Sequence, residues 1–142
     1  MKLEDVIRSK GHDVVTIAPE ATVAALVALM SQHNIGAVVV STDGSHIEGI
    51  VSERDVVRGL AAQGVGVVTA SVASLMVDEV ITADPADEIE ATAATMTAKR
   101  VRHIPVTVDG EISAIVSIGD VVKFRIDQLT DERNHLLGYL HT

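Results

Sequence analysis

The feature that most constrains the fold of this chain is an internal repeat. Sliding the sequence by 66 residues places four markers on their copies, namely Thr16 on Thr82, Pro19 on Pro85, Met30 on Met96 and Asp43-Gly44 on Asp109-Gly110. With the offset shortened by one residue, Ile47–Arg58 aligns with Ile112–Lys123, and seven of these twelve pairs are identical. Proline and Asp-Gly pairs seldom coincide by chance, so the chain contains two copies of one structural unit.

The hydrophobic pattern predicts the order β-α-β-β-α in each copy. A short helix at 3–10 precedes the first copy, which is expected to contain a strand at 13–17, a helix at 22–33, strands at 35–40 and 47–51, and a helix from 52 to about 63. The second copy is expected to contain a short helix at 71–76, a strand at 80–82, a helix at 88–99, strands at 101–108 and 112–116, and a long helix from 117.

One such copy is too small to bury its own sheet, whereas two copies packed face to face can bury both sheets. We therefore expect an α/β (α+β) fold with pseudo-two-fold symmetry and a cleft between the copies. The expected divisions are repeat 1 with its N-terminal helix at 1–63, a linker at 64–70, repeat 2 at 71–126 and a C-terminal helical extension at 127–142.

The same phrase, Ser-x-x-Asp, follows the last strand of each copy and begins the next helix. It is formed by Ser52 with Asp55 and by Ser117 with Asp120. One interpretation is a capping box, in which the two side chains only satisfy the helix end. The other is an anion site, because a helix start offers free N–H groups and a positive dipole end. The two roles are compatible, since a capping serine can also meet a ligand oxygen.

Composition excludes several classes of function. The net charge of −9 disfavours nucleic-acid partners and anionic membranes. The chain has no cysteine, and its six histidines show no metal-binding spacing, so neither disulfides nor a zinc site are expected. The N-terminus lacks a signal-peptide pattern, and the longest apolar run, Val23–Met30, is too short to span a bilayer. A soluble, cytoplasmic protein is the expectation.

The chain resembles a tandem pair of CBS domains, a Bateman module, over nearly its whole length. The resemblance is carried by the twin repeats and by the segments Gly49-Ile50-Val51-Ser52-Glu53-Arg54-Asp55, Arg102-His103-Ile104-Pro105-Val106 and Ile115-Val116-Ser117-Ile118-Gly119-Asp120-Val121-Val122. The chain is similar in particular to the small stand-alone bacterial members. This resemblance implies a regulatory module that binds adenine-containing ligands (AMP, ADP, ATP, and in some members NAD or S-adenosylmethionine), with no obligatory cofactor and no enzymatic activity.

The resemblance also implies roles for individual residues. The junction aspartates Asp55 and Asp120 would hold ribose hydroxyls, and Ser52 and Ser117 would lie near phosphate. The adenine would lie against two pairs of strands, represented by Val14 to Thr16 with Ala37, Val38 and Val39, and by Val80, Ile81 and Thr82 with His103, Ile104 and Pro105.

The basic residues that would meet phosphate are Arg54, Arg102 and His103. The copies are unequal here, because Gly36-Ala37 stands where repeat 2 has Arg102-His103, and Gly119 stands where repeat 1 has Arg54. Either the basic groups converge on one ligand or two ligands bind with unequal affinity. Lys99 and Arg100 have a simpler interpretation, since they complement the dipole at a helix C-terminus.

The tail of the chain leaves two alternatives open. Val122, Leu129 and Leu136 are spaced by seven residues, as are Ile126 and Leu140 around Arg133. This apolar stripe either forms a dimer seam or packs back on its own domain. The resemblance to CBS pairs favours a homodimer. Three classes of function remain: a nucleotide sensor acting on an unknown target protein, an interaction or dimerisation module with a vestigial ligand site, and a hydrolase.

Overall fold

The computed structural model describes residues 1–141 as two similar units joined in tandem. Thr142, the last residue of the expected C-terminal extension, lies outside the described residues. The elements, in chain order, are α1 (Leu3–Lys10), β1 (Thr16–Ile17), α2 (Val23–His33), β2 (Ala37–Val40), β3 (Gly49–Ser52), α3 (Glu53–Gln63), η1 (Gly64–Thr69), η2 (Val72–Ser74), α4 (Ile89–Lys99), β4 (His103–Val108), β5 (Glu111–Ser117) and α5 (Ile118–Leu140).

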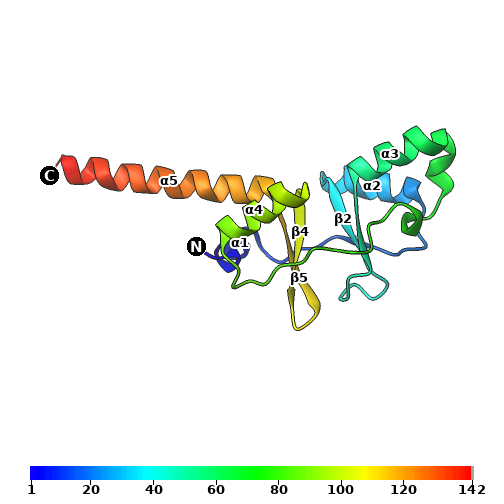
Figure 1. Ribbon diagram of the computed structural model, residues 1–142, viewed down its shortest axis with the longest axis horizontal. Coiled ribbons are helices and arrows are strands. Elements are labelled where there is room, and N and C mark those ends of the chain that lie inside the picture. Colours follow the sequence, from blue (N-terminus) through cyan, green and yellow to red (C-terminus); the bar gives the residue numbers. More distant parts are fainter. Residues whose placement is uncertain (142) are drawn as a thin grey trace.

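The two units lie side by side with their strands toward the middle (Figure 1). Helices α2 and α3 lie at one end, and α1, α4 and the start of α5 lie at the other. In repeat 1 the sheet order is β1-β2-β3, with β1 parallel and β3 antiparallel to β2. In repeat 2 the antiparallel pair β4-β5 turns at Asp109 and Gly110, whose φ angles of 52° and 80° fit a two-residue hairpin turn.

Each unit has its own hydrophobic core, and both cores are built from aliphatic side chains. Repeat 1 buries Val23, Leu26 and Val51 together with Val67 and Val72 from the connecting segment. Repeat 2 buries Leu3, Val6, Ile7, Ile89, Met96, Ile104, Val106, Ala114, Val116 and Val121. A fully buried side chain of this kind contributes about 1.5–3 kcal/mol.

Helix α1 therefore packs into the core of repeat 2, although it precedes repeat 1 in the sequence. Its counterpart by the 66-residue offset is the segment around η2, which packs into the core of repeat 1. Each unit is thus covered by the segment that leads into the other unit. The division of the chain into residue ranges remains a prediction, but this packing ties α1 physically to repeat 2.

The predicted strand at 80–82 is wrong, since only a single parallel bridge forms nearby, between Ala83 and Val106. Pro105 accounts for the difference. Its carbonyl accepts from the amide of Ala83 at 3.0 Å, so its nitrogen faces the same edge, but proline has no N–H to donate to Ile81. In repeat 1, Val39 occupies this position and pairs with Thr16.

Two other expectations need correction. The strand expected at 13–17 is only two residues long, and the short helix expected at 71–76 is the 3-10 turn η2. The expected linker at 64–70 contains the 3-10 helix η1. The remaining helices and strands follow the predicted pattern with small changes at their ends. Thr22 caps α2, because its hydroxyl accepts from the amide of Ala25 at 3.1 Å.

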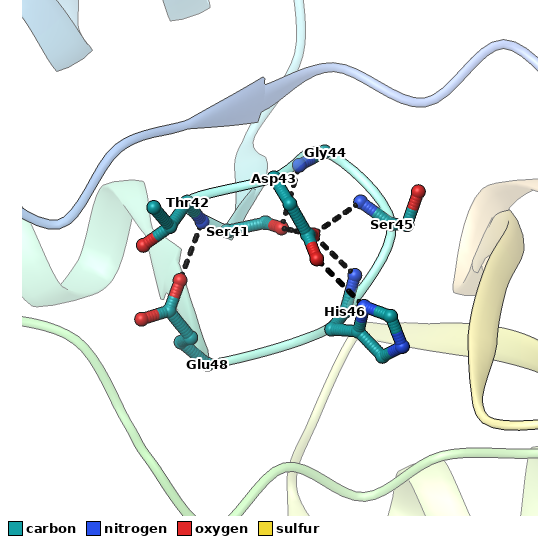
Figure 2. A network of polar contacts seen from close by, with 7 residues as sticks. All are labelled: Ser41, Thr42, Asp43, Gly44, Ser45, His46 and Glu48. Atoms are coloured by element: carbon teal, nitrogen blue, oxygen red, sulfur yellow. Dashed lines mark hydrogen bonds and ion pairs between the residues drawn. The ribbon is translucent and has the colours of Figure 1, made fainter.

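The loop between β2 and β3 is organised by Asp43 (Figure 2). Its carboxylate accepts from the amides of Ser45 and His46, both at 2.8 Å, and lies 2.7 Å from Nδ1 of His46. These contacts hold the pKa of Asp43 well below its usual range. The carbonyl of Ser45 accepts from the amide of Ile112 at 2.8 Å, so this ordered loop also joins repeat 1 to the β4-β5 hairpin.

Candidate functional site

The two Ser-x-x-Asp junctions have the same backbone geometry. In repeat 1, the amide of Glu53 donates to the carbonyl of Gly36 at 2.9 Å. In repeat 2, the equivalent amide of Ile118 donates to the carbonyl of Arg102 at 2.8 Å. Each junction therefore ties the first residue of a helix to the residue just before the neighbouring strand, which places Ser52 opposite Ala37 in repeat 1 and Ser117 opposite His103 in repeat 2.

Both junctions form complete capping boxes. The amide of Ser117 donates to Oδ2 of Asp120 at 2.8 Å, and the amide of Asp120 donates to Oγ of Ser117 at 3.1 Å. The matching distances for Ser52 and Asp55 are 2.8 Å and 3.4 Å, with an added hydroxyl contact of 3.0 Å. The capping interpretation is therefore confirmed at both positions, and it leaves the ligand interpretation open.

At the second junction, strand pairing adds the other predicted residues. His103 lies opposite Ser117, Ile104 opposite Val116 and Pro105 opposite Ile115. The side chains of Ile104 and Val38 are fully buried, and Ala37 is 5% exposed, so these three residues offer a ligand little besides their backbone. In repeat 1, Ala37 lies opposite Ser52 and Thr16 beside Val39.

Ile81 and Thr82 line a separate cavity. A cavity of about 260 Å³ lies between the segment 81–83 and helix α4, and Ile104 also lines it. Neither Asp120 nor Ser117 is among its lining residues. The structure thus separates the predicted adenine contacts of repeat 2 into a set at the junction and a set under α4.

The sequence did not predict the cation at the second junction. Nζ of Lys10, the last residue of α1, donates to Oδ2 of Asp120 at 2.5 Å and to the carbonyl of Ile115 at 2.6 Å. Burial alone would raise the pKa of Asp120, but the hydrogen bonds from Lys10 and Ser117 outweigh it and lower that pKa. The junction carboxylate is therefore ionised and paired.

His103 is the titratable group at the centre of this cluster. Burial lowers its pKa, and the nearby cations Lys10 and Arg102 lower it further, whereas the carboxylates of Glu53 and Asp120 act in the opposite direction. Glu53 begins helix α3 of repeat 1, so the start of that helix lies close enough to His103 to influence its charge. The start of α3 and the second junction are thus electrostatically coupled across the two repeats.

The two arginines predicted to bind phosphate have no bonded partner among the described residues. Within residues 1–141, the side chains of Arg54 and Arg102 make no hydrogen bond or ion pair. Both residues are exposed. Their guanidinium groups are thus free to bind an anion. No group of three or more metal-ligating side chains is found over the described part of the chain.

The comparisons with known proteins identify the family. The model of the CBS domain matches twice, over residues 3–62 and 72–127. This chain belongs to the CBS domain family. Its sequence is 34% identical to the mitochondrial CBS domain-containing protein CBSX3 of Arabidopsis thaliana, over 97% of this chain and 71% of that protein. None of the helices in residues 1–141 has the length and hydropathy needed to cross a membrane.

Solved structures show the same architecture. The crystal structure of the CBS-domain containing protein ATU1752 from Agrobacterium tumefaciens has a TM-score of 0.85 and 37% identity, covering 88% of this chain and 99% of that one. The CBS domain protein PAE2072 from Pyrobaculum aerophilum was solved with AMP; at 21% identity, a TM-score of 0.75 and coverage of 84% and 89%, it shows the shared fold. The CBS domain pair of protein MJ0100, solved with 5-methylthioadenosine and S-adenosyl-L-methionine, does so at 18% identity, a TM-score of 0.79 and coverage of 90% and 98%.

Proposed function

We propose that this CBS pair is a regulatory module that binds an adenine nucleotide of the AMP, ADP or ATP type and acts on a partner protein. The observation that carries the proposal is the second junction, where an ionised carboxylate, a helix N-terminus and the side chains of Arg102 and His103 lie together. A carboxylate suits the two ribose hydroxyls, whereas a helix N-terminus and an arginine suit phosphate.

Two further facts support an adenine-containing ligand. The solved CBS proteins PAE2072 and MJ0100 hold AMP, and 5-methylthioadenosine with S-adenosylmethionine, respectively. In this chain, the walls available to a base are aliphatic, since Phe124 and Tyr139 are the only aromatic residues. The proposal involves binding without a chemical step, so incubation with ATP should release no phosphate.

A second candidate function is an interaction module whose ligand site is vestigial. The observation that favours it is helix α5, on which Ile126, Leu136 and Leu140 are 56%, 63% and 76% exposed. Exposed apolar side chains along one helix are typical of a protein-binding surface. The two candidates differ in whether the junctions bind a nucleotide.

Thermal unfolding with added ligand separates the two candidates. AMP, ADP or ATP at a hundredfold over its Kd should stabilise the protein by about 2.7 kcal/mol, and guanine nucleotides should do so less at equal concentration. Scanning calorimetry suits this chain because it contains no tryptophan. A variant with Asp55→Ala and Asp120→Ala serves as the matched control and should lose the shift. No response of the wild type to AMP, ADP, ATP, NAD or S-adenosylmethionine would favour the interaction module.

A further inference from the structure

The ion pair between Lys10 and Asp120 occupies one of the two carboxylate oxygens that a ribose would contact. Oδ2 of Asp120 accepts from the amide of Ser117 and from Nζ of Lys10, at 2.8 Å and 2.5 Å. The two side chains are 29% and 25% exposed, so the pair is half-buried and only weakly screened by salt. Within residues 1–141 no contact involves Oδ1, so a ribose that pairs its two hydroxyls with both carboxylate oxygens must compete with Lys10 for Oδ2.

Repeat 1 shows that the junction forms without such a cation. Asp55 makes the same capping box as Asp120, and within residues 1–141 it bonds only to Ser52. The residue 66 positions after Lys10 is Met76, whose uncharged side chain packs over Gly49. Because the two folded junctions are otherwise alike, Lys10 is not needed to build one.

The second contact of Lys10 places its ammonium at the open edge of β5. Strand β5 pairs only with β4 in the described sheet, and the carbonyls of Ser113 and Ile115 on its other edge accept from His12 and Lys10. In repeat 1, the equivalent edge of β3 is closed by backbone bonds between Ile50 and Val77, both 2.9 Å. A flexible lysine thus stands where repeat 1 has fixed backbone, and it can leave without moving α1.

We propose that Lys10 is a specificity-determining residue, which makes the Asp120 site select phosphorylated nucleosides over unphosphorylated ones. This inference rests on the proposed function and deepens it. A nucleoside that takes Asp120 removes the partner of Lys10 and offers no anion in return. A nucleotide also takes Asp120, but its phosphate oxygens receive the released ammonium beside Arg102 and His103. The same lysine therefore opposes adenosine and assists AMP or ATP.

The test compares Lys10→Met and Lys10→Gln with a matched control, Arg8→Met, by isothermal calorimetry with adenosine, AMP and ATP. Arg8 lies on the same helix, and its removal changes the net charge equally, but its side chain is 75% exposed and, within residues 1–141, pairs only with Asp5. Both Lys10 variants should bind adenosine more tightly and AMP and ATP more weakly. The ratio of ATP affinity to adenosine affinity should fall by roughly tenfold or more, since hydrogen bonds to charged groups are the strong ones.

Each outcome of this experiment decides something. A fall of the ratio in both Lys10 variants, with Arg8→Met like wild type, supports the inference, and repeating the titrations with Asp55→Ala present assigns the effect to the second junction. Equal changes for adenosine and ATP, or no change, would overturn the inference and leave the proposed function intact. Wild-type protein that binds none of the three ligands would reject both. Lys10→Gln keeps a polar side chain at the edge of β5, so it tests the charge even where Lys10→Met does not fold.

Discussion

His103 and Ser117 lie directly opposite each other in the β4-β5 ladder, so the half-buried histidine stands beside the start of α5. Burial lowers the pKa of His103 below its ordinary value of 6.5, so near neutral pH it carries no charge in the free protein. A bound phosphate would favour the charged form and raise that pKa. Binding of ATP then takes up a proton whenever the pH lies between the free and bound pKa values of His103.

We therefore predict that ATP affinity rises as the pH is lowered through the bound pKa of His103, and levels off below its free pKa, which lies under 6.5. His103→Gln should flatten this dependence, whereas His33→Gln, on an exposed residue, should not. Calorimetric titrations at several pH values measure the effect. The phosphate of ATP titrates equally in all three proteins, so identical pH profiles in wild type and His103→Gln would contradict the prediction.

A second prediction separates the sugar from the phosphate. Arg102→Ala should weaken the binding of ATP by roughly 1.5–3 kcal/mol and leave the binding of adenosine unchanged. The reason is that the Arg102 side chain bonds to no described residue and is free to bind phosphate. Asp120→Ala should weaken adenosine and ATP alike. Calorimetry with both ligands measures the difference.

The control for the variants Arg102→Ala and Asp120→Ala is Lys99→Ala, which removes an exposed charge three residues before Arg102. Equal losses of affinity for adenosine and for ATP in Arg102→Ala would contradict the assignment of Arg102 to phosphate. If Asp120 were only a helix cap, Asp120→Ala would lower stability by about 1 kcal/mol and leave both affinities of the folded protein unchanged.

The repeat made most of the fold predictable, since it fixed the order of elements twice. The strand at 80–82 did not form, because the hydrophobic pattern does not register that Pro105 on the neighbouring strand lacks an N–H toward Ile81. Such a loss depends on which strand lies next to which, and local periodicity carries no information on that.

Site contacts between residues close in the sequence could be predicted, whereas those between residues far apart in the sequence could not. Ser117 and Asp120 are three residues apart, so their capping box could be predicted from the sequence alone. Lys10 lies 110 residues from Asp120, and nothing around it marks it as a ligand-site residue. The repeat offset matches α1 with the segment around η2, but only the packing in the structure shows that each of these segments covers the other unit.

A third prediction concerns the close approach of β3 to the segment that follows η2. A Cβ added at Gly49 would lie 2.6 Å from Sδ of Met76 and 2.9 Å from the carbonyl oxygen of Val77. Gly49→Ala should destabilise the protein by about 1–3 kcal/mol, as overpacking does. Thermal unfolding measures this, and Gly66→Ala is the control, since a Cβ there meets nothing within 4 Å. A stability equal to that of the control would show that Met76 can move away without cost.

The last prediction concerns helix α5, which has 23 residues and projects from the body of the molecule (Figure 1). Leu129 and Leu136 on its stripe are 47% and 63% exposed, so the alternative that this stripe packs back on its own domain is wrong. We predict a homodimer that buries the stripe, as the seven-residue spacing favours. The double variant Leu129→Asp with Leu136→Asp should then be a folded monomer, as measured by light scattering.

The matched control for the α5 seam is Thr130→Asp with Asn134→Asp, which adds the same charge to exposed positions on another face of the helix. This control should remain a dimer. A leucine double variant that also stays dimeric would place the interface elsewhere, with the exposed Val57 and Leu60 of α3 as the next apolar positions to test. Wild-type protein that is monomeric at every concentration would contradict the dimer itself. Because both leucines are exposed in the monomer, their replacement should leave the unfolding temperature of the isolated chain nearly unchanged.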